Sequence, residues 1–202
     1  NAAWNLVAIG QGGLGLGTRD YYTSDDPDKK KVLEAYKTYL THLFQLVGND
    51  EATAKSKMQQ VLDIETEIAK ASYDEVKLRD IDGNYHKMSY TELVDQFPGI
   101  DWGNVMLASG MPAIDSINVA QPEPIHEVEK ILANTPLEDL KTYAEAKVIS
   151  GAASQLSDAF RKEAFQFGSA LSGVKQDRPR WKRAVSLVSG TLGEAIGKLY
   201  VD

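Results

Sequence analysis

Residues 10–22 read GQGGLGLGTRDYY, and this stretch decides between two very different folds. Gly10, Gly12 and Gly15 match G-x-G-x-x-G, the pattern with which strand–helix–strand domains bind dinucleotides at a helix N-terminus. Here the residues after Gly17 do not make a good helix start, and Pro27 blocks continuation. Two helical patterns then follow with no strand between them, and we expect no parallel strands in the chain. The stretch therefore favours a flexible glycine turn over a cofactor site.

Most of the remaining sequence has a helical period. Residues 29–47 carry an apolar residue every three or four positions, and Asn49-Asp50 can cap a second helix. Residues 135–138 (TPLE) start another, and a final helix is expected over 178–202. The middle is broken: Asp82-Gly83 indicates a hairpin or loop, a capping box occupies 89–92, and 114–119 read as extended. We predict a mainly α fold, a multi-helix domain over 1–202 with a small hairpin or irregular middle segment.

The composition excludes several classes of protein. The net charge of −7 and the single small basic cluster at 175–183 argue against a nucleic-acid partner. No apolar run approaches the roughly 20 residues of a membrane span. Cysteine is absent, which removes disulfides, thiolate nucleophiles and cysteine-ligated zinc. Asn1-Ala2 fit the remnant of a cleaved expression tag.

Three short patterns imitate catalytic or metal sites. His126-Glu127-Val128-Glu129-Lys130 begins like the zinc helix His-Glu-x-x-His, but Lys130 has no lone pair for a metal. Residues 123–126 hold one Glu-x-x-His, which is insufficient for a di-iron site, and Pro124 argues against a helix there. Asp63 and Glu67 are better explained as a solvated helix face or an ion pair with Lys70 than as an acid/base pair. The residues alone predict no catalytic set and no bound metal, which leaves a helical binding or structural module.

Four segments resemble, in order and spacing, one known family. GGLGLGTRDYY (12–22), VLDIETEIAKAS (61–72), YHKMSYTELVDQFPGIDW (85–102) and RPRWKRAVSLVSGTLGEAIGKLYVD (178–202) are similar to segments of the neprilysin and endothelin-converting-enzyme family of zinc metalloendopeptidases. The resemblance implies part of the N-terminal, non-catalytic lobe, which covers the active-site chamber and limits substrates to peptides. Zinc and the catalytic residues would then belong to the parent enzyme and none of them to this chain, whose partner would be the catalytic domain of the same polypeptide. The alternative is a stand-alone helical module that binds proteins or peptides without catalysis.

The resemblance also assigns structural roles and a location. The family-motif residues are Gly13, Gly15, Arg19, Asp20, Tyr21, Tyr22, Arg180, Trp181, Gly197, Leu199 and Tyr200. We expect an ion pair between Arg19 and Asp20, and we expect Trp181 and Tyr200 to anchor the last helix to the core. The competing role for Arg19 or Arg180 is to face the chamber and hold a substrate carboxylate. Ser24 and Ala184 stand near cysteines of animal members, which fits a bacterial parent that is periplasmic, secreted or lipid-anchored.

Overall fold

The computed structural model describes residues 5–111 and 113–201, and their fold is mainly α, as the sequence predicts. In chain order the elements are β1 (Val7–Ile9), α1 (Asp20–Thr23), α2 (Pro27–Leu46), α3 (Glu51–Ala71), α4 (Glu75–Leu78), β2 (Lys87–Ser89), α5 (Tyr90–Gln96), α6 (Trp102–Ala108), β3 (Ser116–Val119), α7 (Pro122–Asn134), α8 (Leu137–Ala152), the 3-10 helix η1 (Ala153–Gln155), α9 (Asp158–Ser172), α10 (Arg180–Thr191) and α11 (Gly193–Val201). Within the described ranges, no helix combines the length and the apolar character that a bilayer crossing requires.

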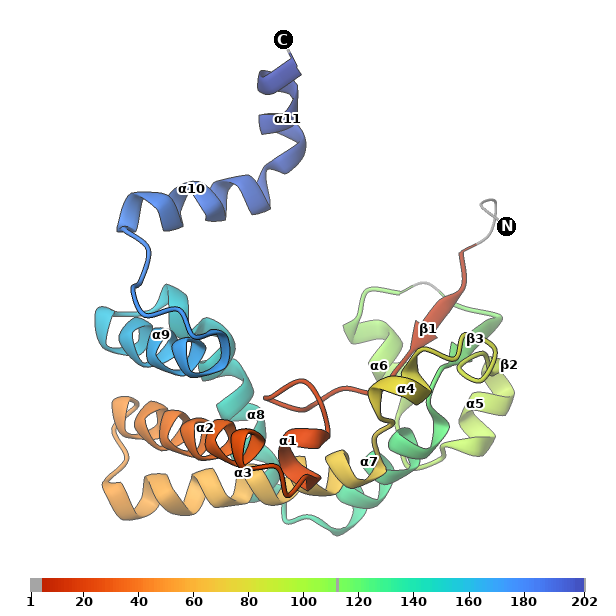
Figure 1. Cartoon of the computed structure of the whole chain (residues 1–202). Coiled ribbons are helices and arrows are strands. Elements are labelled where there is room, and N and C mark those ends of the chain that lie inside the picture. The colour runs from red at the N-terminus through yellow and green to blue at the C-terminus, as the bar shows by residue number, and fades with distance from the viewer. Residues whose placement is uncertain (1–4, 112, 202) are drawn as a thin grey trace.

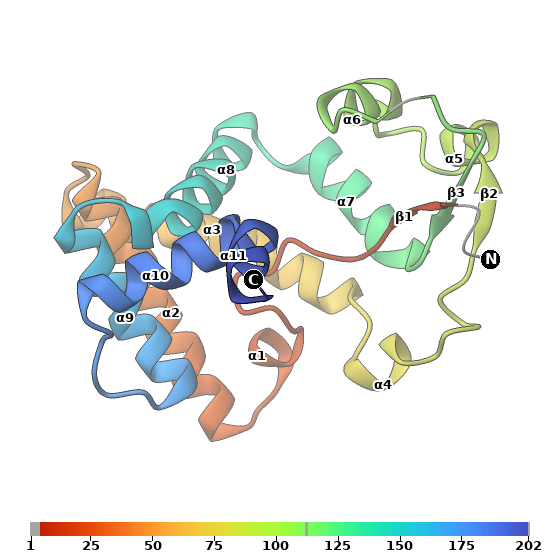
Figure 2. The ribbon, with the colours of Figure 1, turned by 90° about the horizontal axis from the view of Figure 1, so that it is seen from above.

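Helices α2, α3, α8 and α9 pack into a helical body, with the short α1 beside α2 and α3 (Figures 1 and 2). Asp26 caps α2 by accepting a hydrogen bond from the amide of Asp28, and Pro27 is the first helical residue. Asp50 caps α3 in the same way, as expected. The apolar stripes meet in a core that includes Tyr36, Tyr39, Leu40, Leu43, Phe44, Val61 and Leu62.

The middle of the chain forms a small lobe around a three-stranded sheet. The strand order is β1-β3-β2, with Val7 opposite Ile117 in the parallel pair and Met88 opposite Ile117 in the antiparallel pair. The expectation of no parallel strands is therefore wrong for one pair, because β3, which lies far from β1 in the sequence, pairs with β1 in parallel. The Asp82-Gly83 turn lies in the loop before β2 and closes no hairpin of its own.

Helix α7 joins the small lobe to the helical body. It starts at Pro122, so the argument from Pro124 against a helix there is wrong: both prolines lie in the first turn, where no amide donor is needed. Ile131 of α7 packs against Ile64 and Ile68 of α3. This contact is one of those that join the small lobe to the body.

The predicted final helix is two helices, α10 and α11, broken at Leu192. We call them the α10–α11 arm; Figure 1 shows it in blue, leaving the body at the end of α9 and turning away from it. None of the described residues of α10 or α11 is buried. The expectation that Trp181 and Tyr200 anchor the last helix to the core is wrong for this chain, because the body offers the arm no surface.

Candidate functional site

The glycine stretch passes over the helical body in a conformation that other residues do not readily adopt. Gly13 and Gly17 have positive φ angles of 89° and 80°. A Cβ atom on Gly15 would lie 1.9 Å from the Tyr36 hydroxyl oxygen, which leaves no room for any side chain. The glycines thus let the main chain approach α2 and α3 directly, as the turn interpretation predicts.

That close approach places the main chain on a buried carboxylate, Glu65 of α3, which is 0 % exposed. The Gly15 amide donates a hydrogen bond to Glu65 Oε1 (3.1 Å), as does the Tyr36 hydroxyl (3.1 Å). The Tyr22 hydroxyl donates to Oε2 (2.7 Å), and Lys147 Nζ of α8 forms an ion pair with Oε1. We call these five residues the Glu65 cluster. It joins the glycine turn, α1, α2, α3 and α8 at one point.

The cluster keeps its tyrosines protonated. Burial, followed by the charge of Glu65, raises the pKa of Tyr22 and of Tyr36 far above the ordinary value. The same two causes raise the pKa of the neighbouring Tyr143 to about 12. Each hydroxyl therefore acts as a donor to a carboxylate or a carbonyl, which is a positioning role and not proton transfer at neutral pH.

The N-terminal motif residues surround this cluster. Tyr143 donates a hydrogen bond to the carbonyl of Gly13 (2.7 Å), and Tyr21 packs against the body's core. Arg19 donates to the carbonyl of Ser72 (3.0 Å). Asp20 pairs with Lys29 (2.7 Å), so the expected ion pair between Arg19 and Asp20 is not formed.

The second set of motif residues lies on the α10–α11 arm and is exposed to solvent. Trp181 is 64 % exposed and Tyr200 is 92 % exposed, and Leu199 is also exposed. Arg180 is an exposed residue at the start of α10, and a Cβ added to Gly197 would meet open space. The structure therefore separates the two motif groups: the first surrounds the Glu65 cluster, and the second lies exposed on the α10–α11 arm.

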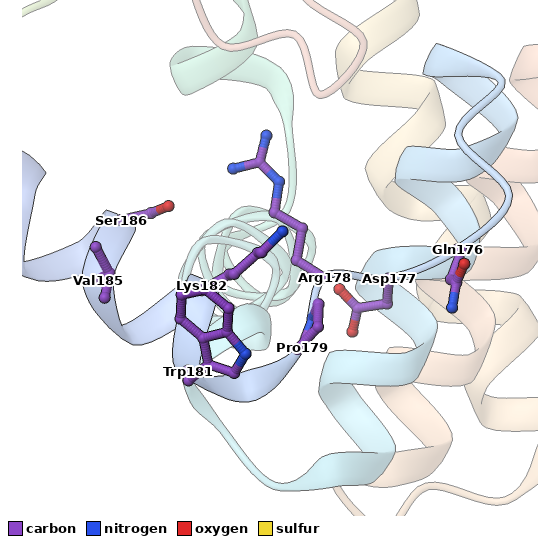
Figure 3. A pocket seen from close by; sticks show the side chains of 8 residues that line it. All are labelled: Gln176, Asp177, Arg178, Pro179, Trp181, Lys182, Val185 and Ser186. Atoms are coloured by element: carbon purple, nitrogen blue, oxygen red, sulfur yellow. The ribbon is translucent and has the colours of Figure 1, made fainter.

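The base of the arm holds an open pocket of about 730 Å³ (Figure 3). Its apolar wall consists of Pro179, Trp181 and Val185, and the Arg178 and Lys182 side chains extend into the same space. Lys182 Nζ lies 5.4 Å from the centre of the Trp181 ring, a cation–π contact. A pocket this open suits contact with another protein segment better than enclosure of a small molecule.

The histidines do not assemble into a metal site. His42 bonds to Glu163 (2.7 Å), His86 to the carbonyl of Val119 (3.1 Å), and His126 to Glu129 (3.0 Å). In residues 5–111 and 113–201, no group of three potential ligands is arranged to hold a metal ion. The donor set of these residues therefore does not fit zinc.

Sequence reasoning missed the centre of the N-terminal site. Glu65 belongs to the quoted segment 61–72, but neither it nor Lys147 is among the predicted site residues. One signal was present: Glu65 occupies a position of the apolar face of α3, between Val61 and Ala69 at helical spacing. A charged residue at such a position has to find a partner, because a lone buried charge is too costly.

Three comparisons with known proteins agree. The N-terminal model of "Peptidase family M13" matches residues 1–202. Endothelin-converting enzyme 1 of Rattus norvegicus is 32 % identical over 209 residues, covering 100 % of this chain and 27 % of the relative. The Mycobacterium tuberculosis zinc metalloprotease ZMP1 superposes with a TM-score of 0.92 in complex with an inhibitor (35 % identity, 97 % of this chain, 30 % of that chain). In its open state the TM-score is 0.91, with 34 % identity over 97 % of this chain and 31 % of that chain.

The chain thus spans less than a third of the length of the relatives it matches. Those relatives are named as a converting enzyme and a zinc metalloprotease, and the family match extends over both motif groups. The chain belongs to peptidase family M13, of which it represents N-terminal domain sequence.

Proposed function

We propose that this chain is a non-catalytic helical lobe of a zinc metalloendopeptidase and that it covers the active-site chamber, so that only peptides of limited size reach the metal. Zinc, its ligands and the catalytic residues belong, in this proposal, to the part of the parent polypeptide that this chain does not span. The similar proteins are a zinc metalloprotease and converting enzymes, of which the matched region makes up only 27–30 %, and this supports a peptidase parent. The parent acts outside the cytoplasm, in keeping with the expectation for bacterial members.

The observation that carries the proposal is the exposed apolar face of the α10–α11 arm. The exposed apolar side chains lie on both helices and at the break between them: Trp181, Val185, Leu187, Val188, Leu192, Leu199, Tyr200 and Val201. So many exposed large apolar side chains on one segment are typical of a protein–protein interface. The rest of the parent polypeptide is the partner available to every copy of the chain, and we assign this face to it.

A charge placed on this face tests the assignment. Trp181→Asp in the isolated chain should change the free energy of unfolding by less than about 0.5 kcal/mol, because the indole is already exposed. In the full-length parent, the same change should weaken the closure of the lobe over the chamber. The matched control is Val76→Asp, an apolar residue on α4 that is also mostly exposed.

The readout is the ratio of kcat/KM for a long unfolded polypeptide, such as casein, to kcat/KM for a short fluorogenic peptide. We expect a low ratio for the wild-type parent, a raised ratio for Trp181→Asp and no change for Val76→Asp. A parent that cleaves casein as readily as the short peptide contradicts size restriction by this lobe. The sequence that follows Asp202 in the gene tests the alternative: a stand-alone binding module has no downstream His-Glu-x-x-His helix.

A further inference from the structure

The α10–α11 arm is joined to the helical body by a short connection, residues 173–179. Gly173 begins this connection with a positive φ of 72° and donates its amide to the carbonyl of Ser169, which ends α9. No described residue of the arm is buried, so apolar packing does not set the arm's direction. Its direction then depends on polar contacts across the connection.

One side chain supplies those contacts. Asp177 Oδ2 forms an ion pair with Arg161 Nη1 of α9 and another with Arg183 Nη1 of α10 (3.1 Å). The same Arg183 nitrogen donates to the carbonyl of Arg178. Among the described residues, this is the only chain of hydrogen bonds and ion pairs that runs from α9 to α10.

All three side chains are more sheltered than those of the exposed ion pairs on the helix surfaces. Asp177 is 27 % exposed, Arg161 22 % and Arg183 33 %, whereas the surface pair of Lys31 and Asp28 is 77 % and 89 % exposed. A shared acceptor between two guanidinium groups also fixes both arginines at once. The contact therefore restrains two helices through one carboxylate.

We propose that Asp177 is a positioning residue that locks the angle at which the α10–α11 arm leaves the body. This lock holds the apolar face of the arm in the direction from which the rest of the parent meets it. The proposal rests on the proposed function for the purpose of the arm, but the lock itself is a property of this chain. The similar ZMP1 has been solved in states described as open and as partially open.

The test measures the direction of the arm. The sequence contains no cysteine, so Ala52→Cys on α3 and Ala195→Cys on α11, both exposed, allow two spin labels without further changes. Double electron–electron resonance on the full chain then gives the distribution of label distances. Asp177→Ala should cause a roughly 5- to 10-fold rise in the share of molecules outside the main peak, the factor expected for two partly exposed ion pairs.

The arginine variants separate a lock from a general loss of stability. Arg161→Met and Arg183→Met should each broaden the distribution, and either one combined with Asp177→Ala should broaden it no further. Asp158→Ala is the matched control, because Asp158 bonds to Arg161 Nε (3.2 Å) without reaching the arm. It should leave the distribution unchanged.

Two further measurements complete the test. A body pair, Ala52→Cys with Ala170→Cys on α9, should give the same narrow peak in every variant, which shows that the body is folded. Raising the salt concentration should broaden the arm distribution of the wild type and not that of Asp177→Ala. An unchanged arm distribution in Asp177→Ala, or equal broadening in Asp158→Ala, overturns the proposal. Neither result depends on peptidase activity, so failure of the lock is distinguishable from failure of the proposed function.

Discussion

Gly15→Ala should be among the most damaging single-methyl additions in this chain. The new Cβ would lie 1.9 Å from the Tyr36 hydroxyl oxygen and 2.4 Å from the ring carbon that bears it. Tyr36 is 3 % exposed and packed in the core of the body, so its ring has little space into which to retreat. The glycine turn must lift, or the tyrosine must rotate.

Either movement breaks contacts with Glu65. Lifting the turn removes the hydrogen bond from the Gly15 amide, and rotating the ring removes the bond from Tyr36. A hydrogen bond to a charged group contributes about 1.5–3 kcal/mol, and overpacking adds about 1–3 kcal/mol. We therefore expect Gly15→Ala to lower the free energy of unfolding by about 2.5–6 kcal/mol.

The assay is urea unfolding of the full chain, followed by circular dichroism at a helical wavelength. Gly12→Ala is the matched control, because a Cβ there meets nothing within 4 Å and its φ is not positive. It should stay within about 1 kcal/mol of the wild type. Gly15→Ala combined with Tyr36→Phe should cost less than the sum of the single changes. Equal stabilities of Gly15→Ala and Gly12→Ala would refute the reasoning.

The remaining predictions concern the charge and the protons of the same cluster. Lys147→Met removes the cation beside Glu65 and should cost about 2–4 kcal/mol, less than the full loss of a buried pair because Lys147 is partly exposed. The control is Lys141→Met, which removes a lysine from an exposed ion pair and should change the free energy of unfolding by less than about 1 kcal/mol. Adding Glu65→Gln to Lys147→Met should recover part of the lost stability. If urea titrations give the same cost for Lys147→Met and Lys141→Met, the role of Lys147 as the partner of Glu65 is contradicted. Because the folded chain raises the pKa of Tyr22 and Tyr36, its stability is complete below about pH 10 and falls as the pH rises further, by about 1.4 kcal/mol per pH unit for each tyrosine. Urea titrations from pH 9 to 11.5 should show a smaller slope for Tyr22→Phe than for the wild type, and equal slopes would rule out this source of alkaline instability.

Several helices of the body and of the small lobe could be predicted from the sequence because their signals are local. The stripe over 29–47, the cap at Asp50 and the capping box at 89–92 all lie within a few residues of the helices that they define. The parallel pairing of β1 with β3 could not be predicted in this way. It depends on a partner strand that lies beyond six intervening helices, and no local pattern encodes such a pairing.

The candidate sites divide in the same manner. Backbone chemistry predicts the glycine turn. Its hydrogen-bond partner Glu65 lies on α3, however, and Lys147, the cation that pairs with Glu65, lies on α8. The exposure of Trp181 and Tyr200 runs against their apolar character, because the surface that would cover them is not supplied by the helical body. Local rules identify which residues are apolar or strained, and only the assembled fold identifies what they touch.

The Glu65 cluster has a consequence for how this polypeptide is made on the ribosome. Glu65 emerges 82 residues before Lys147, the cation that neutralises it. Until that lysine leaves the exit tunnel, Glu65 has hydrogen-bond donors from Gly15, Tyr22 and Tyr36 but no cation, so α2 and α3 associate less favourably than in the finished body. We therefore expect the helical body to close only after α8 has been synthesised, which protease protection of ribosome-bound chains of increasing length would test.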